Sequence, residues 1–472
     1  MGKKKSKQNP VIMKITYIFT AIFLLMAGYF AYFEIFVGER IINNTYNKRQ
    51  SAFEKIVVRG DIVSADGKVL ATTVTDDSGE ETRYYPFDNL FSHTIGITHH
   101  GKTGIELNYD YNLLGADVNI FEKITNEFAD RKTQGNIVKT TLDTKIQKVA
   151  YDSLGQNNGA VIVLDPENGD IISLVSKPDF NPNTLLKEWD DIVEQEDNSC
   201  LVNRATNGLY TPGSTFKIIT LLEYIREKRD YTKYAYTCNG FYEEDGIRVN
   251  CYNGHAHGYV DAFGSFAYSC NSSFINMGLD LNISSLKNTA EELLFNKKLP
   301  LDMDYKESSY TLDKTSSKFD VMQTVIGQGK TLVSPMHMAL IASAIANDGI
   351  LVRPRIVTKI TNHNDFAVKK FGVKKYGELI SKEEAQLLKT AMSETVRYGT
   401  GTRLKSDLYN AYGKTGTAEI DSSNLAHSWF VGFAENKDGK KIAVCVLLES
   451  MPPGSTPAVP VCRNIFDAYF SE

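Results

Sequence analysis

Ser214 and Lys217, three residues apart in the segment TPGSTFKIITLLEYI, form the most informative local motif of the chain. Pro212 and Gly213 interrupt the chain before them, and the apolar run that follows predicts a helix over 214–227 with the serine in its first turn. Residues three apart on a helix face the same side, and a desolvated lysine can lose its proton and act as a base. The pair is therefore suited to nucleophilic catalysis by the serine hydroxyl. A capping serine beside a solvated lysine would have the same spacing.

Two further segments bring polar groups that such a serine would need. Ser269 and Asn271 supply a hydroxyl and a carboxamide two residues apart, suited to moving a proton and holding a substrate amide. A later segment opens a predicted strand with a cation, hydroxyls and a glycine that admits close approach of a ligand: Lys414, Thr415, Gly416 and Thr417. A strand of this kind can bind a peptide as an additional strand.

The order SxxK, SxN and KTG along the chain resembles the signature of the penicillin-recognising serine acyltransferases. Within that group the chain is similar to class B penicillin-binding proteins, and the similarity covers nearly everything after the N-terminal apolar run. The segments that carry it are RGDIVSADGKVLA, GKTGIELNYDYNLLG, NRATNGLYTPGSTFK, IGQGKTLVSPMHMA, RYGTGT and HSWFVGF. The resemblance implies an α/β (α+β) transpeptidase domain of the serine β-lactamase-like type, on a small β-rich pedestal.

The resemblance also implies a role for each motif residue. Ser214 would attack the carbonyl between the two D-alanines of a stem peptide, with Lys217 as the base. Ser269 and Lys414 would relay the proton to the leaving amine, and Asn271 would hold the substrate amide. The terminal carboxylate would be bound by the hydroxyls of the KTG segment, Thr415 and Thr417, beside Gly416. The backbone N–H groups of Ser214 and Thr417 would form the oxyanion hole.

The expected partners follow from the same resemblance. They are peptidoglycan stem peptides, a neighbouring stem amine as acceptor, and β-lactams that would acylate Ser214. The chemistry needs no cofactor. No glycan-polymerising segment is apparent in the sequence, so a multispan glycan-strand polymerase is the implied protein partner. The sequence leaves open whether the protein serves elongation, division or sporulation.

Two other functions share the three motifs. A serine β-lactamase would need a group that activates water for deacylation, and Glu292 and Asn296, four residues apart, superficially resemble such a pair. A solvated helix face with Asn296 near its end is the favoured explanation, because an anchor and a pedestal suit a cell-wall synthase. A β-lactam sensor would carry several membrane spans and a cytoplasmic effector domain. This chain has one predicted span, preceded by a tail of about 14 residues that is too short for an effector domain.

A second group of chemically active residues lies just before Ser269. Cys238, Cys251, His255 and His257 have the spacing C-x12-C-x3-H-x-H, which predicts a tetrahedral zinc site that braces the loop, and Cys270 could join it. A disulfide between Cys238 and Cys251, or free thiols, are the alternatives.

The N-terminus predicts a membrane anchor. An uncharged run from Ile15 to Phe33 would span roughly 28 Å as a helix, and lysines precede it. The charge asymmetry places the N-terminus in the cytoplasm and the rest outside. A cleaved signal peptide is the alternative, but bulky Tyr32 and Phe33 stand where small residues are needed. The expected organisation is a cytoplasmic tail (1–14), an anchor (15–36), a pedestal (37–140) and a transpeptidase domain (141–472).

The elements that would position the motifs come from both ends of this last domain. Hydrophobic patterns predict a helix over 145–154 and two strands around 159–176, then helices at 274–281, 285–294 and 335–347. Three strands follow at 412–420, 428–434 and 441–449. One antiparallel sheet built from distant segments, with helices on its faces, is the expected result.

The overall charge gives no case for nucleic acid as a partner. With 52 basic and 57 acidic residues the chain is faintly acidic.

Overall fold

The computed structural model describes residues 10–33, 57–115, 129, 131–195, 199–420, 425–452, 454 and 456–471. Helix α1 (Pro10–Tyr32) contains a 22-residue stretch, Val11–Tyr32, that is long and apolar enough to cross a membrane. Its large apolar side chains are exposed, as expected for a helix that faces lipid. The expected tail through residue 9 and the pedestal residues 37–56 lie outside the described residues.

The pedestal is built on a six-stranded sheet with the order β15-β14-β6-β2-β3-β4. Its N-terminal strands are β2 (Ile62–Val63), β3 (Val69–Thr75), β4 (Glu81–Tyr84) and β6 (Ile137–Thr140). A separate parallel pair joins β1 (Val57–Val58) to β5 (Thr133–Gln134). Short helical turns lie between β4 and β5: η2 (Asp88–Phe91), α4 (Ser92–Ile95), α5 (Gly104–Asn108) and α6 (Asp110–Leu113). Of these, α6 contacts β6, whereas η2 and α4 contact β8 (Ile171–Lys177) of the second sheet.

Two strands of this sheet come from much later in the chain. β14 (Val357–Thr361) pairs antiparallel with β6, and β15 (Ala367–Lys370) pairs with β14 at the sheet edge. The predicted boundary between the pedestal and the transpeptidase domain, at residue 140, therefore falls in a chain whose two parts both contribute strands to the pedestal sheet. This boundary stays a prediction. Strand β6 ends at Thr140, and Asp143 then caps the following helix α8 (Thr144–Leu154).

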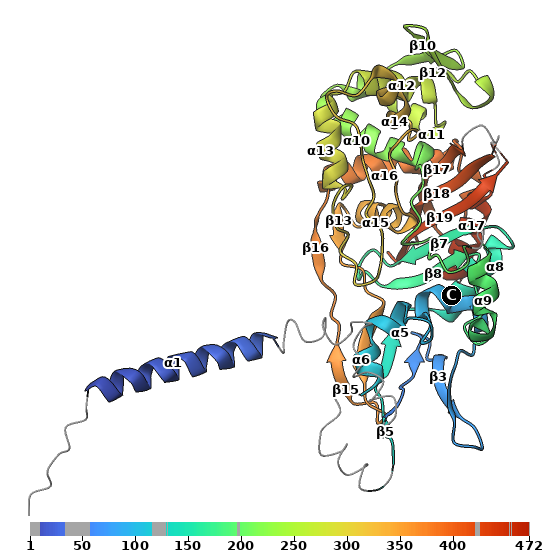
Figure 1. Cartoon of the computed structure of the whole chain (residues 1–472). Helices are drawn as coiled ribbons and strands as arrows, with labels where there is room; N and C mark the ends of the chain where they lie inside the picture. The colour runs from blue at the N-terminus through green and yellow to red at the C-terminus, as the bar shows by residue number, and fades with distance from the viewer. Residues whose placement is uncertain are drawn as a thin grey trace, which may run out of the picture.

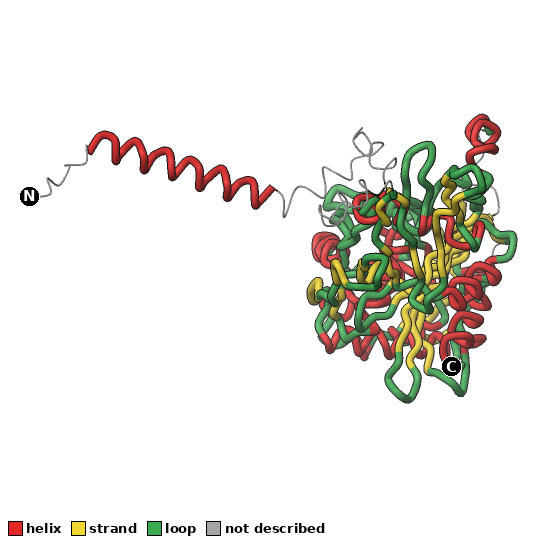
Figure 2. Tube along the Cα trace, turned by 90° about the horizontal axis from the view of Figure 1, so that it is seen from below, coloured by secondary structure: helices red, strands yellow, loops and turns green. Residues whose placement is uncertain are grey.

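The second large sheet is five-stranded and antiparallel, with the order β17-β18-β19-β7-β8. The strands are β7 (Gly159–Leu164), β8 (Ile171–Lys177), β17 (Asn410–Ile420), β18 (Leu425–Glu435) and β19 (Lys441–Met451). This confirms that the first hairpin joins the C-terminal meander in one sheet. Figure 2 shows these strands inside the body of the protein, with helices beside them.

The central strands are buried on both faces because two separate cores flank the sheet. Along β7, Ala160 and Ile162 belong to the larger core, which includes α15 (Pro335–Ala346). Val161 and Val163 belong to the second core, formed with α8 and α17 (Ala458–Phe470). Successive residues of a strand point to opposite faces, so an uninterrupted apolar run is needed here.

The remaining helices form a lobe above the sheet and a peripheral layer (Figure 1). They are α9 (Leu185–Glu194), η3 (Gly213–Phe216), α10 (Lys217–Glu227), η4 (Tyr231–Lys233), η5 (Tyr252–Gly254), α11 (Ala262–Ala267), α12 (Asn271–Leu279), α13 (Ile283–Glu292), α14 (Lys318–Val325), α16 (Lys382–Arg397) and η6 (Thr402–Leu404). Two short antiparallel strand pairs belong to the lobe: β9 (Tyr236–Cys238) with β12 (Gly258–Val260), and β10 (Phe241–Glu244) with β11 (Ile247–Asn250). A third pair, β13 (Ile350–Val352) with β16 (Lys375–Glu378), lies below the lobe beside α15 (Figure 1).

Helices α16 and α17 were not expected from the sequence. α16 begins at a full capping box, in which the Ser381 side chain and Glu384 exchange hydrogen bonds with each other's backbone. α17 follows Pro457 and buries Val461 and Phe466 against the sheet. Helix α10 was expected from Ser214, but a 3-10 turn, η3, carries Ser214 and the α-helix begins at Lys217.

Candidate active site

Ser214 lies on η3, a turn that packs tightly between β17 and the end of α14. The Gly213 N–H donates a 2.8 Å hydrogen bond to the Gly327 carbonyl. Gly327 has φ +82°, and a Cβ there would lie 1.7 Å from the Gly213 oxygen. A Cβ on Gly213 would lie 2.5 Å from the Thr417 carbonyl oxygen. Glycine is thus required at both positions, and the close fit places Ser214 beside Thr417 on the edge strand β17.

Lys217 is fully buried one turn after Ser214. Its Nζ donates hydrogen bonds to the Asn271 Oδ1 at 2.7 Å and to the Ser269 carbonyl at 2.8 Å, and the Ser269 Oγ lies 3.3 Å away. Burial lowers the pKa of Lys217 to about 8, while the nearby thiols of Cys270 and Cys251 act in the opposite direction. A lysine in this position is neutral in a substantial fraction of molecules near pH 8, as a base requires.

Ser269 occupies the turn between α11 and α12 in a left-handed conformation, with φ +58°. Its Oγ accepts a 2.8 Å hydrogen bond from Lys414 Nζ. Lys414 is also fully buried, and its pKa is well below the usual value because of burial and then the charge of Lys217. Non-glycine residues rarely adopt this backbone conformation, which makes Ser269 a site of functional strain. The hydroxyl therefore sits between two amines with lowered pKa.

The KTG segment forms the middle of β17. The hydroxyls of Thr415 and Thr400 lie 2.5 Å apart. A Cβ on Gly416 would lie 2.9 Å from the Thr215 methyl group, so glycine lets the strand approach the turn that carries Ser214. Thr417 is half-buried and pairs with Ser428 of β18. Thr400 lies in the RYGTGT segment, which the sequence pointed to without giving this residue a role.

The structure thus brings the three motifs together. Lys217, Ser269, Asn271 and Lys414 form one hydrogen-bonded network, and the fit of η3 against β17 places Ser214 next to Thr417. The Asn271 carboxamide is oriented from both ends, because its Nδ2 donates to the Asn250 carbonyl at 3.1 Å. Asn250 was not expected from the sequence, since a backbone carbonyl carries no side-chain signal. The roles of these residues in turnover remain predictions.

Glu292 and Asn296 are engaged elsewhere. The Glu292 carboxylate accepts a 2.7 Å hydrogen bond from Arg226. The Asn296 carboxamide exchanges two 3.0 Å hydrogen bonds with the backbone of Tyr310. These contacts fit a structural role for both residues, as opposed to activation of a hydrolytic water.

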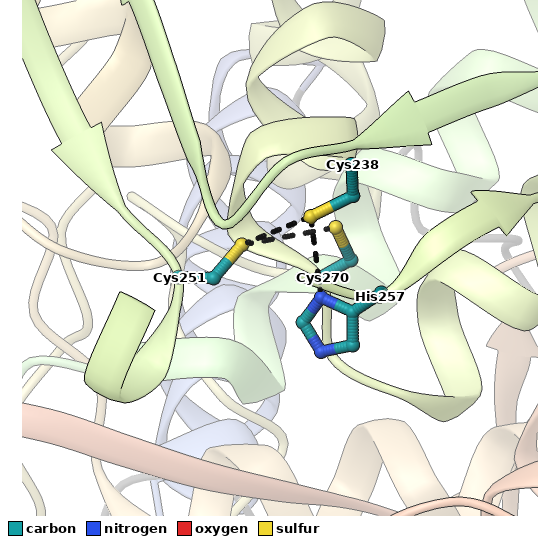
Figure 3. Close-up of side chains that lie close together, drawn as sticks. All are labelled: Cys238, Cys251, His257 and Cys270. Atoms are coloured by element: carbon teal, nitrogen blue, oxygen red, sulfur yellow. Dashed lines mark hydrogen bonds between the residues drawn. The ribbon is translucent and has the colours of Figure 1, made fainter. Parts of the chain in front are cut away.

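A cluster of three thiols and an imidazole lies directly behind the Ser269–Asn271 turn (Figure 3). Ligand atoms of Cys238, Cys251, His257 and Cys270 all lie within 4.8 Å of one another. Cys238 Sγ is 3.7 Å from Cys251 Sγ and 3.4 Å from His257 Nδ1, and Cys251 Sγ is 3.9 Å from Cys270 Sγ. This donor set matches the Cys₃His composition of structural zinc sites.

The expected ligand His255 is not in the cluster, and Cys270 takes the fourth place. The chain reverses at Asn253, where φ is +50°, and the His255 ring then packs edge-on against His257 with centroids 5.0 Å apart. Cys270 enters because it is the N-cap of α12, where its Sγ accepts from the Ser273 N–H. Spacing along the chain could not separate these two candidates, since the ligands meet only after the loop folds back on α12.

The fold is an antiparallel sheet with helices on both sides, and its site combines a serine turn, a buried lysine and a KTG edge strand. Together they define a serine acyltransferase of the penicillin-recognising class. Residues 159–467 match the family model described as penicillin binding protein transpeptidase domain. Residues 59–138 match the penicillin binding protein A dimerisation domain. The chain belongs to the penicillin-binding protein transpeptidase family, and the resemblance to its class B members is confirmed.

Curated relatives support this assignment. The chain is 27% identical to the peptidoglycan D,D-transpeptidase PbpA of Mycolicibacterium smegmatis, over 98% of this chain and 99% of that protein. It is 27% identical to the stage V sporulation protein D of Bacillus subtilis, over 88% of this chain and 69% of that protein. It spans 66% of the length of the peptidoglycan D,D-transpeptidase MrdA of Acinetobacter baumannii at 26% identity.

Solved structures give the same fold. The D,D-transpeptidase domain of a peptidoglycan glycosyltransferase from Eggerthella lenta is 28% identical, with a TM-score of 0.80 over 88% of this chain and 99% of that one. The imipenem acyl-enzyme complex of penicillin-binding protein A from M. tuberculosis is 26% identical, also with a TM-score of 0.80, over 88% of this chain and 99% of that one. These neighbours confirm the expected mixed architecture of a transpeptidase domain on an N-terminal pedestal.

Proposed function

We propose that this protein is a peptidoglycan D,D-transpeptidase with Ser214 as its nucleophile. The Ser214 Oγ attacks the carbonyl carbon between the two terminal D-alanines of a stem peptide. The C–N bond then breaks, D-alanine leaves as an amine, and an acyl-enzyme remains. The amine of a neighbouring stem attacks this ester and regenerates the serine. Water in place of that amine would give D,D-carboxypeptidase activity on the same site.

The proton route follows the buried network. Neutral Lys217 takes the proton of Ser214 as the hydroxyl attacks, because its lowered pKa leaves a free lone pair near pH 8. Ser269 lies 3.3 Å from Lys217 and 2.8 Å from Lys414, so its hydroxyl can pass a proton toward the leaving amine. Asn271 keeps Lys217 in place and offers its second amide N–H to the substrate. The connection of both lysines to the Ser269 hydroxyl is the observation that supports this mechanism most.

Substrate binding uses the edge of β17. The substrate backbone adds to this strand, and the hydroxyls of Thr415 and Thr417 bind its terminal carboxylate, with Lys414 nearby. The N–H groups of Ser214 and Thr417 face the developing oxyanion, and one such donor can contribute roughly 3 kcal/mol to transition-state stabilisation. Gly416 keeps the strand close enough to the Ser214 turn for both donors to reach one oxygen.

Mass spectrometry of the intact full-length chain in detergent, incubated with a penicillin, tests this proposal. The expected result is one adduct of the drug's mass that persists for hours and is absent in Ser214→Ala. An adduct that disappears as the drug is consumed would favour the alternative β-lactamase function. Failure of the native chain to form any adduct would contradict the nucleophile assignment. Ser393→Ala, a change on the solvent side of α16, is the matched control.

We infer that α1 is a single-pass anchor with a cytoplasmic N-terminus and an extracytoplasmic catalytic domain. The lysines before α1, and the glutamates Glu34 and Glu39 after it, support this orientation. The transpeptidation of stem peptides acts on glycan strands, so a multispan glycan-strand polymerase is the proposed partner. Protease protection of the C-terminal epitope in intact cells tests the orientation.

We propose that the cluster of Cys238, Cys251, Cys270 and His257 holds a structural zinc ion. Three buried thiols and one imidazole nitrogen fit a tetrahedral site of this type. Ser214 already supplies a nucleophile, so the ion would brace the loop behind Ser269. The purified chain should contain one equivalent of zinc by elemental mass spectrometry. His257→Ala should lose it, and His255→Ala should retain it. Absence of metal together with a Cys238–Cys251 disulfide would contradict the zinc proposal.

A further inference from the structure

Two tyrosine rings lie side by side next to the catalytic network. Tyr268 directly precedes Ser269, and Tyr398 directly follows α16. Their ring centroids are 5.4 Å apart, with the ring planes inclined at 53°. The Tyr268 ring also lies 6.1 Å from the His257 ring, so two neighbours support it, yet 41% of its surface is exposed. We call Tyr268 and Tyr398 the tyrosine pair; the proposed proton route uses neither of them.

The turn after Tyr398 is docked on the end of α11. The Thr400 N–H donates a 3.1 Å hydrogen bond to the carbonyl of Ala267, the last residue of that helix. A Cβ on Gly399 would lie 2.2 Å from the same oxygen, so the two segments are in direct backbone contact. Figure 1 shows α11, α16 and β17 close together where the lobe meets the sheet. The tyrosine pair is therefore positioned by the elements that also carry Ser269.

The tyrosine pair lies at the end of the site where the proposed mechanism binds the terminal carboxylate of the donor. Thr400, two residues after Tyr398, has its hydroxyl 2.5 Å from the hydroxyl of Thr415. The leaving D-alanine therefore occupies this end, since Thr415 binds its carboxylate. The incoming amine must attack the same acyl carbon from the place that D-alanine has left. The chain that carries the incoming amine must then extend along this end of the site.

The surroundings of the pair suit an amine on an aliphatic chain. An exposed aromatic ring offers a flat apolar face to methylene groups, and its π-system attracts a cation. Burial, the 2.6 Å hydrogen bond to Glu394, and the charges of Glu394 and Asp261 raise the pKa of Tyr398, so two carboxylates lie near this ring. The Arg397 guanidinium lies 5.4 Å from the Tyr398 ring centroid. Among the described residues, no lysine or arginine lies over the ring of Tyr268.

We propose that the exposed face of Tyr268 is the acceptor subsite, which binds the aliphatic chain of the primary amine that accepts the acyl group. The inference rests on the proposed transpeptidase function and identifies the part of the same site that selects the acceptor. The amine nitrogen forms a C–N bond to the acyl carbon while the ester C–O bond to Ser214 breaks. The amine proton passes through the Ser269 hydroxyl to the Ser214 oxygen. Tyr268 takes no part in this transfer; it holds the amine close to the ester.

Partition of the acyl-enzyme between amine and water tests this subsite. The full-length chain in detergent is incubated with a synthetic pentapeptide that ends in D-Ala-D-Ala, and with either Nα-acetyllysine amide or methylamine at equal free-base concentration. Methylamine is a similar nucleophile without the long chain. Mass spectrometry gives the ratio of amide product to hydrolysed tetrapeptide. In Tyr268→Ala this ratio should fall about fivefold with Nα-acetyllysine amide and stay unchanged with methylamine.

Two variants control for other effects of the substitution. Tyr268→Phe keeps the ring and should retain the parent ratio with both amines. Tyr259→Ala removes a tyrosine of β12 that is 74% exposed, and it should also behave like the parent. An unchanged ratio in Tyr268→Ala, or an equal fall with both amines, would overturn the subsite.

Release of D-alanine, measured in the same reactions, separates the subsite from the proposed function. Normal release by the parent with a ratio that does not depend on Tyr268 would overturn the subsite alone. Absence of release by the parent would overturn the proposed function and the subsite together.

Discussion

Lys414 donates a 2.8 Å hydrogen bond to the hydroxyl of Ser269 across 145 positions of the chain. The bond joins the edge strand of the central sheet to a turn in the helical lobe. The contact therefore links the lobe to the sheet within the Lys217–Ser269–Asn271–Lys414 network. Lys414 is fully buried, and Ser269 lies in a turn with a left-handed backbone conformation.

The first prediction concerns the pH dependence of acylation. Lys217 has a pKa lowered to about 8, so the neutral fraction of this base rises with pH, reaches one half at that value and approaches one above it. The rate of penicillin acylation should therefore increase from pH 6 and level off above about 8. Lys217→Arg should reduce the rate by roughly 10²–10⁴-fold, the usual contribution of a general base.

Stopped-flow measurement with a chromogenic β-lactam provides the rates. Lys228→Gln is a suitable control, because Lys228 lies just after the same helix and pairs with exposed Asp280. It should leave both the rate and its pH profile unchanged. A profile that stays flat between pH 6 and 9 would show that Lys217 is not the titrating base.

The second prediction concerns the glycine that supports the Ser214 turn. A Cβ at Gly327 would lie 1.7 Å from the Gly213 carbonyl oxygen, which is backbone and cannot rotate away. Gly327→Ala should displace η3 and reduce acylation by at least about tenfold, which corresponds to 1.4 kcal/mol in the barrier. Gly372→Ala, where no atom lies within 4 Å of the added methyl group, should acylate normally. Equal rates for the two variants would refute this role of the Gly327 contact.

The third prediction concerns the buried ion cluster of the pedestal. Glu106 is fully buried and accepts hydrogen bonds from Arg59 at 2.6 Å and Arg83 at 2.7 Å. Glu106→Gln leaves these guanidinium groups short of a counter-charge and should cost about 3–5 kcal/mol of pedestal stability. The exposed Glu80→Gln should change stability by less than about 0.5 kcal/mol. Thermal unfolding in detergent compares the two variants. Similar unfolding midpoints would contradict the proposed contribution of the buried ion cluster to pedestal stability.

The fourth prediction concerns acid stability. His337 is fully buried on α15, and burial lowers its pKa to about 4. Between pH 6.5 and 4 the unfolded chain binds a proton at this histidine and the folded chain does not. The free energy of unfolding should therefore fall as the pH falls through this window, by up to about 3 kcal/mol from this residue. His337→Leu should flatten that slope, whereas replacing the exposed His363 should not.

Much of the fold was predictable because its signals are local. The apolar runs of β7 and β19 and the helix of α15 are legible from hydrophobic pattern, with Ser334 and Pro335 marking the start of α15. α16 and α17 were missed although α16 has a capping box and both helices are longer than α15. The addition of β14 and β15 to the pedestal sheet was also missed. Pairing between strands more than 200 residues apart depends on the path of the whole chain, and no local pattern records that path.

The sequence alone determined which chemical groups this protein has available: a serine three residues before a lysine, a hydroxyl and a carboxamide flanking a cysteine, and a lysine opening a strand. Tertiary structure decided which of them meet. Only the folded chain buries Lys217 and so lowers its pKa, places Ser269 between two amines, and substitutes Cys270 for His255 in the thiol cluster. The physical reason is that burial and distance are properties of packed surfaces, whereas residue type and spacing along a chain constrain only neighbours within a few turns.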